Sequence, residues 1–291
     1  MKRSIFVLLL ILAGTQLFAQ YPSQKYALRG VWITTVGNYD WPSNPGTTAW
    51  DIQQQKNQLI AILDAHKRFG MNAMFFNARV DCDALYKSSI EPWSRFLTGD
   101  QGAPPSDPNY DPLQLAITES HKRGMELHAW LNPYRAQNTA NDVACNIHVT
   151  KLHPEWIVSC SSSSYKFLNP GLPEVRAYLV KVIMDMVRRY DLDGIHFDDF
   201  FYPYPEYGSF NDDAAYNKYK GTFTDKASWR KNNVNLLLAT INDSLKAVKP
   251  WVKFGISPAA LASVNTDIFA DTFGWLRGNY VDTLGVSHTG T

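Results

Sequence analysis

Residues 173–199, PEVRAYLVKVIMDMVRRYDLDGIHFDD, hold the pattern that decides the fold of this chain. The first part carries apolar side chains at helical spacing, which predicts an amphipathic helix from Pro173 to Tyr190. The second part, Leu192 to Asp198, is a short apolar run that predicts a buried strand. Asp198 and Asp199 stand where this strand ends. A helix leading into a buried strand with polar residues at its carboxyl end is typical of parallel α/β sheets.

The same alternation of strands and helices runs through the rest of the chain. Strands are predicted at Leu28 to Thr35, Asn72 to Val80, Met125 to Leu131, Val252 to Ser257 and Val281 to Val286. Helices are predicted at Trp50 to Phe69, from Asp111-Pro112 to Gly124, at Ser228 to Val248 and near Asp271 to Arg277.

This order of elements predicts an α/β fold whose parallel sheet is either doubly wound or closed into a (β/α)8 TIM-type barrel. No GxGxxG follows the first strand, which weakens the dinucleotide-binding alternative. Polar residues gather at strand ends, where a TIM-type barrel places its active site, so we favour the barrel. A barrel needs eight strands and only about six can be recognised, so we expect an incomplete barrel that lacks its C-terminal part.

The N-terminus predicts export. Lys2 and Arg3 precede an apolar stretch from Ile5 to Ala13, and small or polar residues follow up to Ala19. This layout is typical of a bacterial signal peptide over residues 1–19, with a single barrel domain over residues 20–291, in the periplasm or outside the cell. An uncleaved anchor is the alternative, although the stretch is short for a membrane span. No cysteine follows it, which argues against a lipid anchor, and no stable membrane anchor is expected after cleavage.

The composition of the chain indicates which classes of molecule it is expected to bind. The formal net charge is +1, which gives no electrostatic case for nucleic acid. Aromatic residues make up 13%, which suits either a well-filled core or sugar binding, because an aromatic ring can cover the apolar face of a pyranose. Of three cysteines, Cys145 and Cys160 flank one loop and form the expected pair, which leaves Cys82 over. No local spacing suggests a zinc site, and neither a metal nor a cofactor is expected.

Strand parity predicts which side chains share the rim of the barrel. In the strand that ends at Asp198, His196 and Asp198 should face the barrel mouth, while Ile195 and Phe197 face the helices. In the strand from Met125 to Leu131, one face is predicted to carry Glu126, His128 and Trp130, with Asn132 following on the same side. In the strand from Asn72 to Val80, Asn77 and Arg79 are predicted to share one face.

Each of these residues also has a purely structural interpretation. Asp198 or Asp199 could cap a loop, and His196 could be a core histidine bonded to a neighbour. Arg79 could pair with Asp198 or Asp81, and the tryptophans Trp32 and Trp130 could be core residues.

Five segments resemble the bacterial glycosyl-hydrolase-like 10 family, from about Leu28 to about Asp282. They are LRGVWITTVGNYDWPS, FNARVDCDALYKSSIEPWS, YDPLQLAITESHKRGMELHAWLNPYR, LNPGLPEVRAYL and YDLDGIHFDDFFYPYP. The resemblance implies a (β/α)8 barrel that acts on polysaccharide or oligosaccharide, with bacterial cell-wall glycan as a substrate, and it places Asp198 at the nucleophile position of α-amylase-like barrels.

The strand ends and the family motifs together give the candidate site. The catalytic candidates are Asp198, Asp199 and His196, with His196 and Arg79 expected to keep Asp198 ionised. The candidates for substrate binding are Trp32, Asn77, Arg79, Asp83, His128, Trp130, Asn132, Tyr134, Arg135 and Tyr202.

Glycoside hydrolysis requires a second carboxyl group as proton donor, and the sequence leaves it open. The position at the end of the fifth strand is Ser257, so Asp199, Glu91, Asp83 or a residue beyond Thr291 remain candidates. Two other functions stay open. One is a non-catalytic glycan-binding barrel, as an inactive or truncated copy. The other is a metal-dependent deacetylase that uses His128, His196, Asp198 and Asp199.

Overall fold

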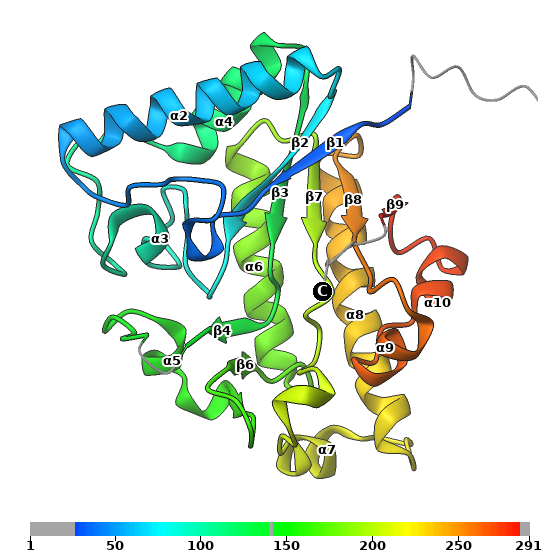
Figure 1. The fold of residues 1–291 in the computed structure, drawn as a ribbon. Coiled ribbons are helices and arrows are strands. Elements are labelled where there is room, and N and C mark those ends of the chain that lie inside the picture. Colours follow the sequence, from blue (N-terminus) through cyan, green and yellow to red (C-terminus); the bar gives the residue numbers. More distant parts are fainter. Residues whose placement is uncertain (1–26, 140–141, 286–291) are drawn as a thin grey trace, which may run out of the picture.

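The computed structural model describes residues 27–139 and 142–285, and its centre is one parallel sheet of six strands (Figure 1). The strands are β1 (Gly30–Ile33), β2 (Ala73–Arg79), β3 (Glu126–Leu131), β7 (Gly194–Phe197), β8 (Lys253–Ile256) and β9 (Thr283–Leu284). They pair in that order, each parallel to its neighbour. All six strands predicted from the sequence are confirmed, and together they form part of a (β/α)8 barrel.

Helices connect the strands and pack against the outer face of the sheet (Figure 1). The long ones are α2 (Ala49–Arg68), α4 (Pro112–Lys122), α6 (Pro173–Arg189) and α8 (Lys226–Val248), with the short α10 (Thr272–Arg277) before β9. The predicted end signals are present: Asp111 accepts a hydrogen bond from the Gln114 N–H at the start of α4. Gly70 and Gly124 have positive φ after α2 and α4, a conformation that glycine adopts without strain.

Apolar side chains on the outer face of the sheet form the core with these helices. Ile195 and Phe197 of β7 are fully buried, as parity predicts, and the Phe197 ring meets the Phe254 ring of β8 edge to face at 5.2 Å. From the other side, α6 contributes Leu179 and Ile183 to the same core. Burial of this apolar surface is the main stabilising contribution to the sheet and helix layers.

The inner face of the sheet is filled by rings that pack over glycines of the neighbouring strand. A Cβ atom at Gly194 would lie 2.2 Å from the His128 ring, and one at Gly255 would lie 2.9 Å from the His196 ring. A Cβ at Gly30 would similarly clash with Phe75. These glycines are therefore required because a neighbouring ring occupies the space of their missing side chain.

The loops after the strands carry elements that the sequence did not reveal. The segment after β3 folds into a small antiparallel sheet, with β4 (Arg135–Gln137) and β5 (Ile157–Ser159) on either side of β6 (Lys166–Leu168). The shorter helices of the loops are η2 (Val36–Asn38), α3 (Arg95–Thr98), α5 (Val149–Leu152), η3 (Pro154–Trp156), η4 (Pro205–Tyr207), α7 (Asp213–Tyr219) and α9 (Ala262–Asp267). Three-residue strands and single helical turns are too short to produce a readable hydrophobic period.

The expected cysteine pair is wrong, because all three cysteines are free. Cys145 lies against the loop of Gln101 and Gly102, and its N–H donates to the Gln101 side chain at 3.2 Å. Cys160 instead follows β5 and forms a backbone bridge with Phe210. Tethering to different segments keeps the two thiols apart, although both lie in or beside the same long loop.

The predicted signal peptide, residues 1–19, lies outside the described residues. Within the part of the chain that the structure describes, no helix is both long enough and apolar enough to cross a membrane.

Candidate active site

Asp198 sits at the carboxyl end of β7 and is held by two side chains of the neighbouring β3 segment. Its Oδ2 accepts hydrogen bonds from Trp130 Nε1 at 3.2 Å and from Asn132 Nδ2 at 3.1 Å. The β3–β7 register sets this contact, because Trp130 is paired with His196 and Asn132 therefore follows level with Asp198. Within the described residues, its other oxygen, Oδ1, accepts one long hydrogen bond, from the Phe200 N–H at 3.4 Å.

The protonation of Asp198 is poised near neutrality. Burial raises the pKa of the Asp198 carboxyl to about 7, with Arg135 opposing the rise and Asp199 adding to it. Burial also raises the pKa of Asp199, while its hydrogen bond from the Tyr204 hydroxyl, 2.5 Å long, opposes that rise. Two carboxyl groups with raised pKa values at one strand end are typical of catalytic acids and bases.

The sequence-based expectation that His196 and Arg79 keep Asp198 ionised is wrong. His196 Nε2 lies 2.7 Å from Ser257 Oγ, and burial lowers the pKa of His196 to about 3, so the ring is neutral. Arg135 is instead the cation that lowers the pKa of Asp198.

Arg79 points to a different part of the molecule. A register shift between Asn77 and Arg79 breaks the predicted alternation of β2. The Arg79 guanidinium forms a buried ion pair with Glu91 at 2.8 Å, and Glu91 also accepts a hydrogen bond from the Tyr178 hydroxyl of α6. Arg79 additionally donates to the backbone carbonyls of Asn132 and Pro133. The pair therefore fixes the backbone that presents Asn132 to Asp198, and Glu91 is engaged there as an ion-pair partner.

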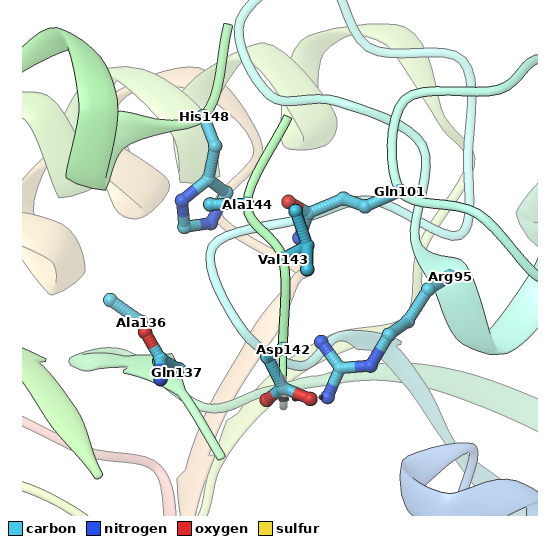
Figure 2. A pocket seen from close by; sticks show the side chains of 8 residues that line it. All are labelled: Arg95, Gln101, Ala136, Gln137, Asp142, Val143, Ala144 and His148. Carbon is cyan, nitrogen blue, oxygen red and sulfur yellow. Dashed lines mark hydrogen bonds and ion pairs between the residues drawn. The ribbon is translucent and has the colours of Figure 1, made fainter. Parts of the chain in front are cut away.

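Arg135 connects Asp198 to a chain of charges in the loops. Arg135 Nε donates to Asp81 at 2.8 Å, and the other Asp81 oxygen accepts from Arg95 at 3.0 Å. Arg95 in turn bonds Asp142 at 2.9 Å. Figure 2 shows Arg95 and Asp142 facing each other in a small pocket of about 10 Å³, close to the space of a single water molecule. The pocket is also lined by Gln101, Ala136, Gln137, Val143, Ala144 and His148.

Most residues predicted to bind substrate are buried. Tyr134 and Tyr202 have no exposed surface, so their prediction as substrate contacts is contradicted by the structure. Both rings follow strand ends but turn into the core, where Tyr202 packs against Phe210 and Phe269. Asp83 is also buried and accepts a hydrogen bond from Gln101 at 3.0 Å.

Asn77 lies beside Trp130, whose carbonyl accepts from the Asn77 amide at 3.4 Å. Trp130 is half-buried, and Trp32 is 40% exposed and stacks on Phe75. Of the predicted binding residues, these two tryptophans thus keep ring surface that a ligand can reach.

The four residues suggested for a metal site are not brought together. His128 Nε2 lies 2.9 Å from Glu126, and His196 faces Ser257, while Asp198 faces Trp130 and Asn132. Across residues 27–139 and 142–285, no group of three or more His, Cys, Asp or Glu has a geometry that could hold a metal ion.

Sequence reasoning missed the aromatic residues of the loops around Asp198. Phe200, Tyr204 and Tyr207 follow β7, and Tyr165 precedes β6. All four are half-buried. The run FFYPYPEY after the strand is the signal that could have found three of them.

A partial (β/α)8 barrel with two adjacent carboxyl groups at the carboxyl end of a strand defines the class of fold: a TIM-type barrel whose polar residues gather where such barrels place an active site. The solved structures that share this fold include an α-L-fucosidase isoenzyme 2 from Paenibacillus thiaminolyticus and a cycloisomaltooligosaccharide glucanotransferase from Paenibacillus sp.. The fucosidase gives a TM-score of 0.53 at 13% identity, over 79% of this chain and 32% of that one. The glucanotransferase gives a TM-score of 0.51 at 13% identity, over 92% of this chain and 35% of that one.

Residues 27–287 match the glycosyl hydrolase-like 10 family, and the chain belongs to that family. The resemblance found in its motifs is thereby confirmed. Glycosyl hydrolase YngK of Bacillus subtilis is 41% identical over 88% of this chain, and glycosyl hydrolase DigH of Escherichia coli K12 is 36% identical over 94%. The chain spans about half the length of the first relative (53%) and two thirds of the second (67%).

The Arg79–Glu91 pair gives a stability prediction. Glu91→Gln leaves the buried Arg79 charge without its partner, so we expect the free energy of unfolding to fall by about 3–5 kcal/mol. Urea denaturation measures this loss. Glu155→Gln is the control, because Glu155 forms an exposed pair with His153 and should change stability by less than about 0.5 kcal/mol. A loss below about 1 kcal/mol for Glu91→Gln would contradict the assigned role.

Proposed function

We propose that this protein hydrolyses glycosidic bonds in a polysaccharide and that Asp198 is its central catalytic carboxylate. One observation carries the proposal: Asp198 is half-buried at the end of β7, fixed by Trp130 and Asn132, with a pKa raised to about 7. Such a group changes its charge near neutral pH, as carboxyl groups that exchange protons or form covalent intermediates do. Membership of a glycosyl hydrolase-like family supports the same chemistry.

The hydrogen bonds of Asp198 give its two oxygens different roles. Trp130 and Asn132 both donate to Oδ2 and hold the carboxylate plane, which leaves Oδ1 as the reactive oxygen. In the proposed reaction, ionised Oδ1 attacks the anomeric carbon, or activates a water that does so. The bond from that carbon to the bridging oxygen breaks, and the leaving oxygen takes a proton from a second carboxyl group. Where Oδ1 itself has attacked, a water activated by that second carboxylate then breaks the bond between the sugar and Asp198 and returns the proton to the second group.

Asp199 is the proton donor that we propose. Asp199 directly follows Asp198 in the chain, and burial raises the pKa of the Asp199 carboxyl, which favours the protonated form that a donor requires. Glu91 and Asp83 are committed to Arg79 and to Gln101, respectively.

Bacterial cell-wall glycan is the substrate that we propose, because the family resemblance implies it. A glycan-binding barrel without hydrolysis is the second candidate. It is favoured by Ser257, since a serine held by His196 occupies the strand end where amylase-like barrels carry their acid.

Removal of the Asp198 charge tests the proposal. Asp198→Asn keeps the side-chain shape but provides no carboxylate, so we expect reducing-end release from peptide-free cell-wall glycan to fall at least about a thousandfold. Asp191→Asn is the matched control, since its side chain is 82% exposed beside His121. Hydrolysis that persists in Asp198→Asn would overturn the assignment, and binding without turnover in the unaltered protein would favour the second candidate.

The raised pKa of Asp198 predicts the pH dependence. Below about pH 7 the group is protonated and cannot attack, so kcat/KM should rise with pH up to about 7, roughly tenfold per unit at the acid end. Asp199→Asn should lower kcat/KM across this pH range, because it removes the proposed proton donor. A kcat/KM that instead falls as pH rises through 7 would make Asp198 the proton donor and contradict its assigned role.

We also propose that residues 1–19 direct export of the protein. The apolar run Ile5 to Ala13 and the preceding Lys2 and Arg3 support this proposal. N-terminal sequencing of the exported protein should begin at Gln20. Leu10→Arg should block export by placing a charge in the apolar run, whereas Ser23→Arg, beyond the cleavage point, should not. Export of Leu10→Arg at the normal level would refute the proposal.

A further inference from the structure

Four half-buried aromatic rings form a continuous wall that begins beside the candidate catalytic carboxyls. Phe200 and Tyr204 meet edge to face, with ring centroids 5.2 Å apart. Tyr204 meets Tyr207 at 5.9 Å, and Tyr207 stacks on Tyr165 at 4.6 Å. The wall therefore leads from the end of β7 to the segment before β6.

The wall is fixed at both ends. At the catalytic end, the Tyr204 hydroxyl donates to Asp199, and the Arg135 guanidinium lies 5.2 Å from the centre of the Phe200 ring. At the far end, Tyr165 stacks at 6.2 Å on Phe167, a buried residue of β6.

Backbone hydrogen bonds hold the two supporting loops together. The Ser162 N–H donates to the Tyr207 carbonyl at 3.0 Å, and the Ser161 N–H donates to the Ser209 carbonyl at 2.8 Å. In Figure 1 the loop after β7 runs towards α7, near the small sheet of β4 and β6. The rings are thus ordered before any ligand arrives, which lowers the entropic cost of binding.

We propose that the wall formed by Phe200, Tyr204, Tyr207 and Tyr165 binds consecutive sugar rings of an extended glycan whose reacting bond lies at Asp198. The proposal rests on the proposed function and deepens it, because it assigns the residues that hold the polysaccharide beyond the reacting bond. Aromatic faces cover the apolar C–H faces of sugar rings, and tyrosine hydroxyls can bond sugar hydroxyls. Continuity with Asp199 points to the substrate of this site as the occupant.

Binding to the Asp198→Asn variant tests the wall, because this variant does not consume its ligand. The probes are peptide-free bacterial cell-wall glycan strands and a tetrasaccharide cut from them. In this background, Tyr165→Ala and Tyr207→Ala should each weaken binding of the long strands roughly threefold to tenfold. The tetrasaccharide, which fills the positions nearest Asp198, should keep its affinity within about twofold of the parent.

Two further variants separate a binding role from a packing role. Tyr165→Trp keeps a flat ring and should retain the affinity for long strands. Trp251→Ala is the control for loss of an exposed ring, because Trp251 is 65% exposed just before β8, at the opposite end of the sheet. It should bind both probes as the parent does. Thermal unfolding curves of all variants show whether the alanine substitutions have disturbed the fold, and Tyr165→Trp remains decisive if they have.

The outcomes distinguish this inference from the proposed function. Unchanged binding of long strands by both alanine variants, or an equal loss for both probes, overturns the wall, as does weakened binding of long strands by Tyr165→Trp. If the unaltered protein hydrolyses glycan in that case, the proposed function stands alone. If the unaltered protein releases no reducing ends but the alanine variants still bind long strands more weakly, hydrolysis fails and the wall stands as a glycan-binding surface.

Discussion

The parallel pairing of β3 with β7 is the constraint on which the site depends. These strands are more than sixty residues apart in sequence, and their register sets His128 opposite Gly194 and Trp130 opposite His196. One step further along, the Trp130 and Asn132 side chains reach Asp198. A slip of one residue would turn Asp198 to the outer face, among the apolar side chains of α6, and would turn Phe197 to the inner face. Gly194 guards against such a slip, because only a residue without Cβ fits beneath the His128 ring.

The fold could be predicted from the sequence because its long elements repeat a readable period. The helix at Pro173–Arg189 and the strand that ends before Asp198 were both found within a residue or two of their observed bounds. The antiparallel sheet of β4, β5 and β6 could not be predicted, because three-residue strands show no alternation that differs from loop sequence. The predicted disulfide between Cys145 and Cys160 is wrong for a related reason, because their spacing in the sequence does not show the path of the loop that separates them.

For the site, parity placed Asp198, Trp130 and Asn132 on one face, but it could not show how charge is arranged around them. Parity assumes an unbroken strand, and the register shift after Asn77 sends Arg79 to Glu91 instead of to the rim. Arg135, three residues past Asn132 in the chain, is the cation that lowers the pKa of Asp198, the role predicted for Arg79. Burial is the other unknown: a pattern can place Tyr202 at a strand end, but only the packing of Phe210 and Phe269 shows that the ring is enclosed.

The charge of Asp198 is controlled from one side. On the β8 side, His196 is neutral and hydrogen-bonded to Ser257. It therefore provides no positive charge to stabilise the Asp198 carboxylate. On the β3 side, Trp130, Asn132 and Arg135 all act on the carboxyl, and Arg135 is itself shared with Asp81. A cation shared with a second carboxylate stabilises the ionised form less than an undivided one, and burial therefore prevails and raises the pKa. The same Arg135 also lies against Phe200, at the start of the aromatic wall. A sugar chain lying along that wall would exclude water from Arg135 and Asp198 together. Exclusion of water strengthens their attraction, but it also raises the cost of the charge on Asp198, so a bound polymer acts on both of the opposing effects that set the pKa of this carboxyl.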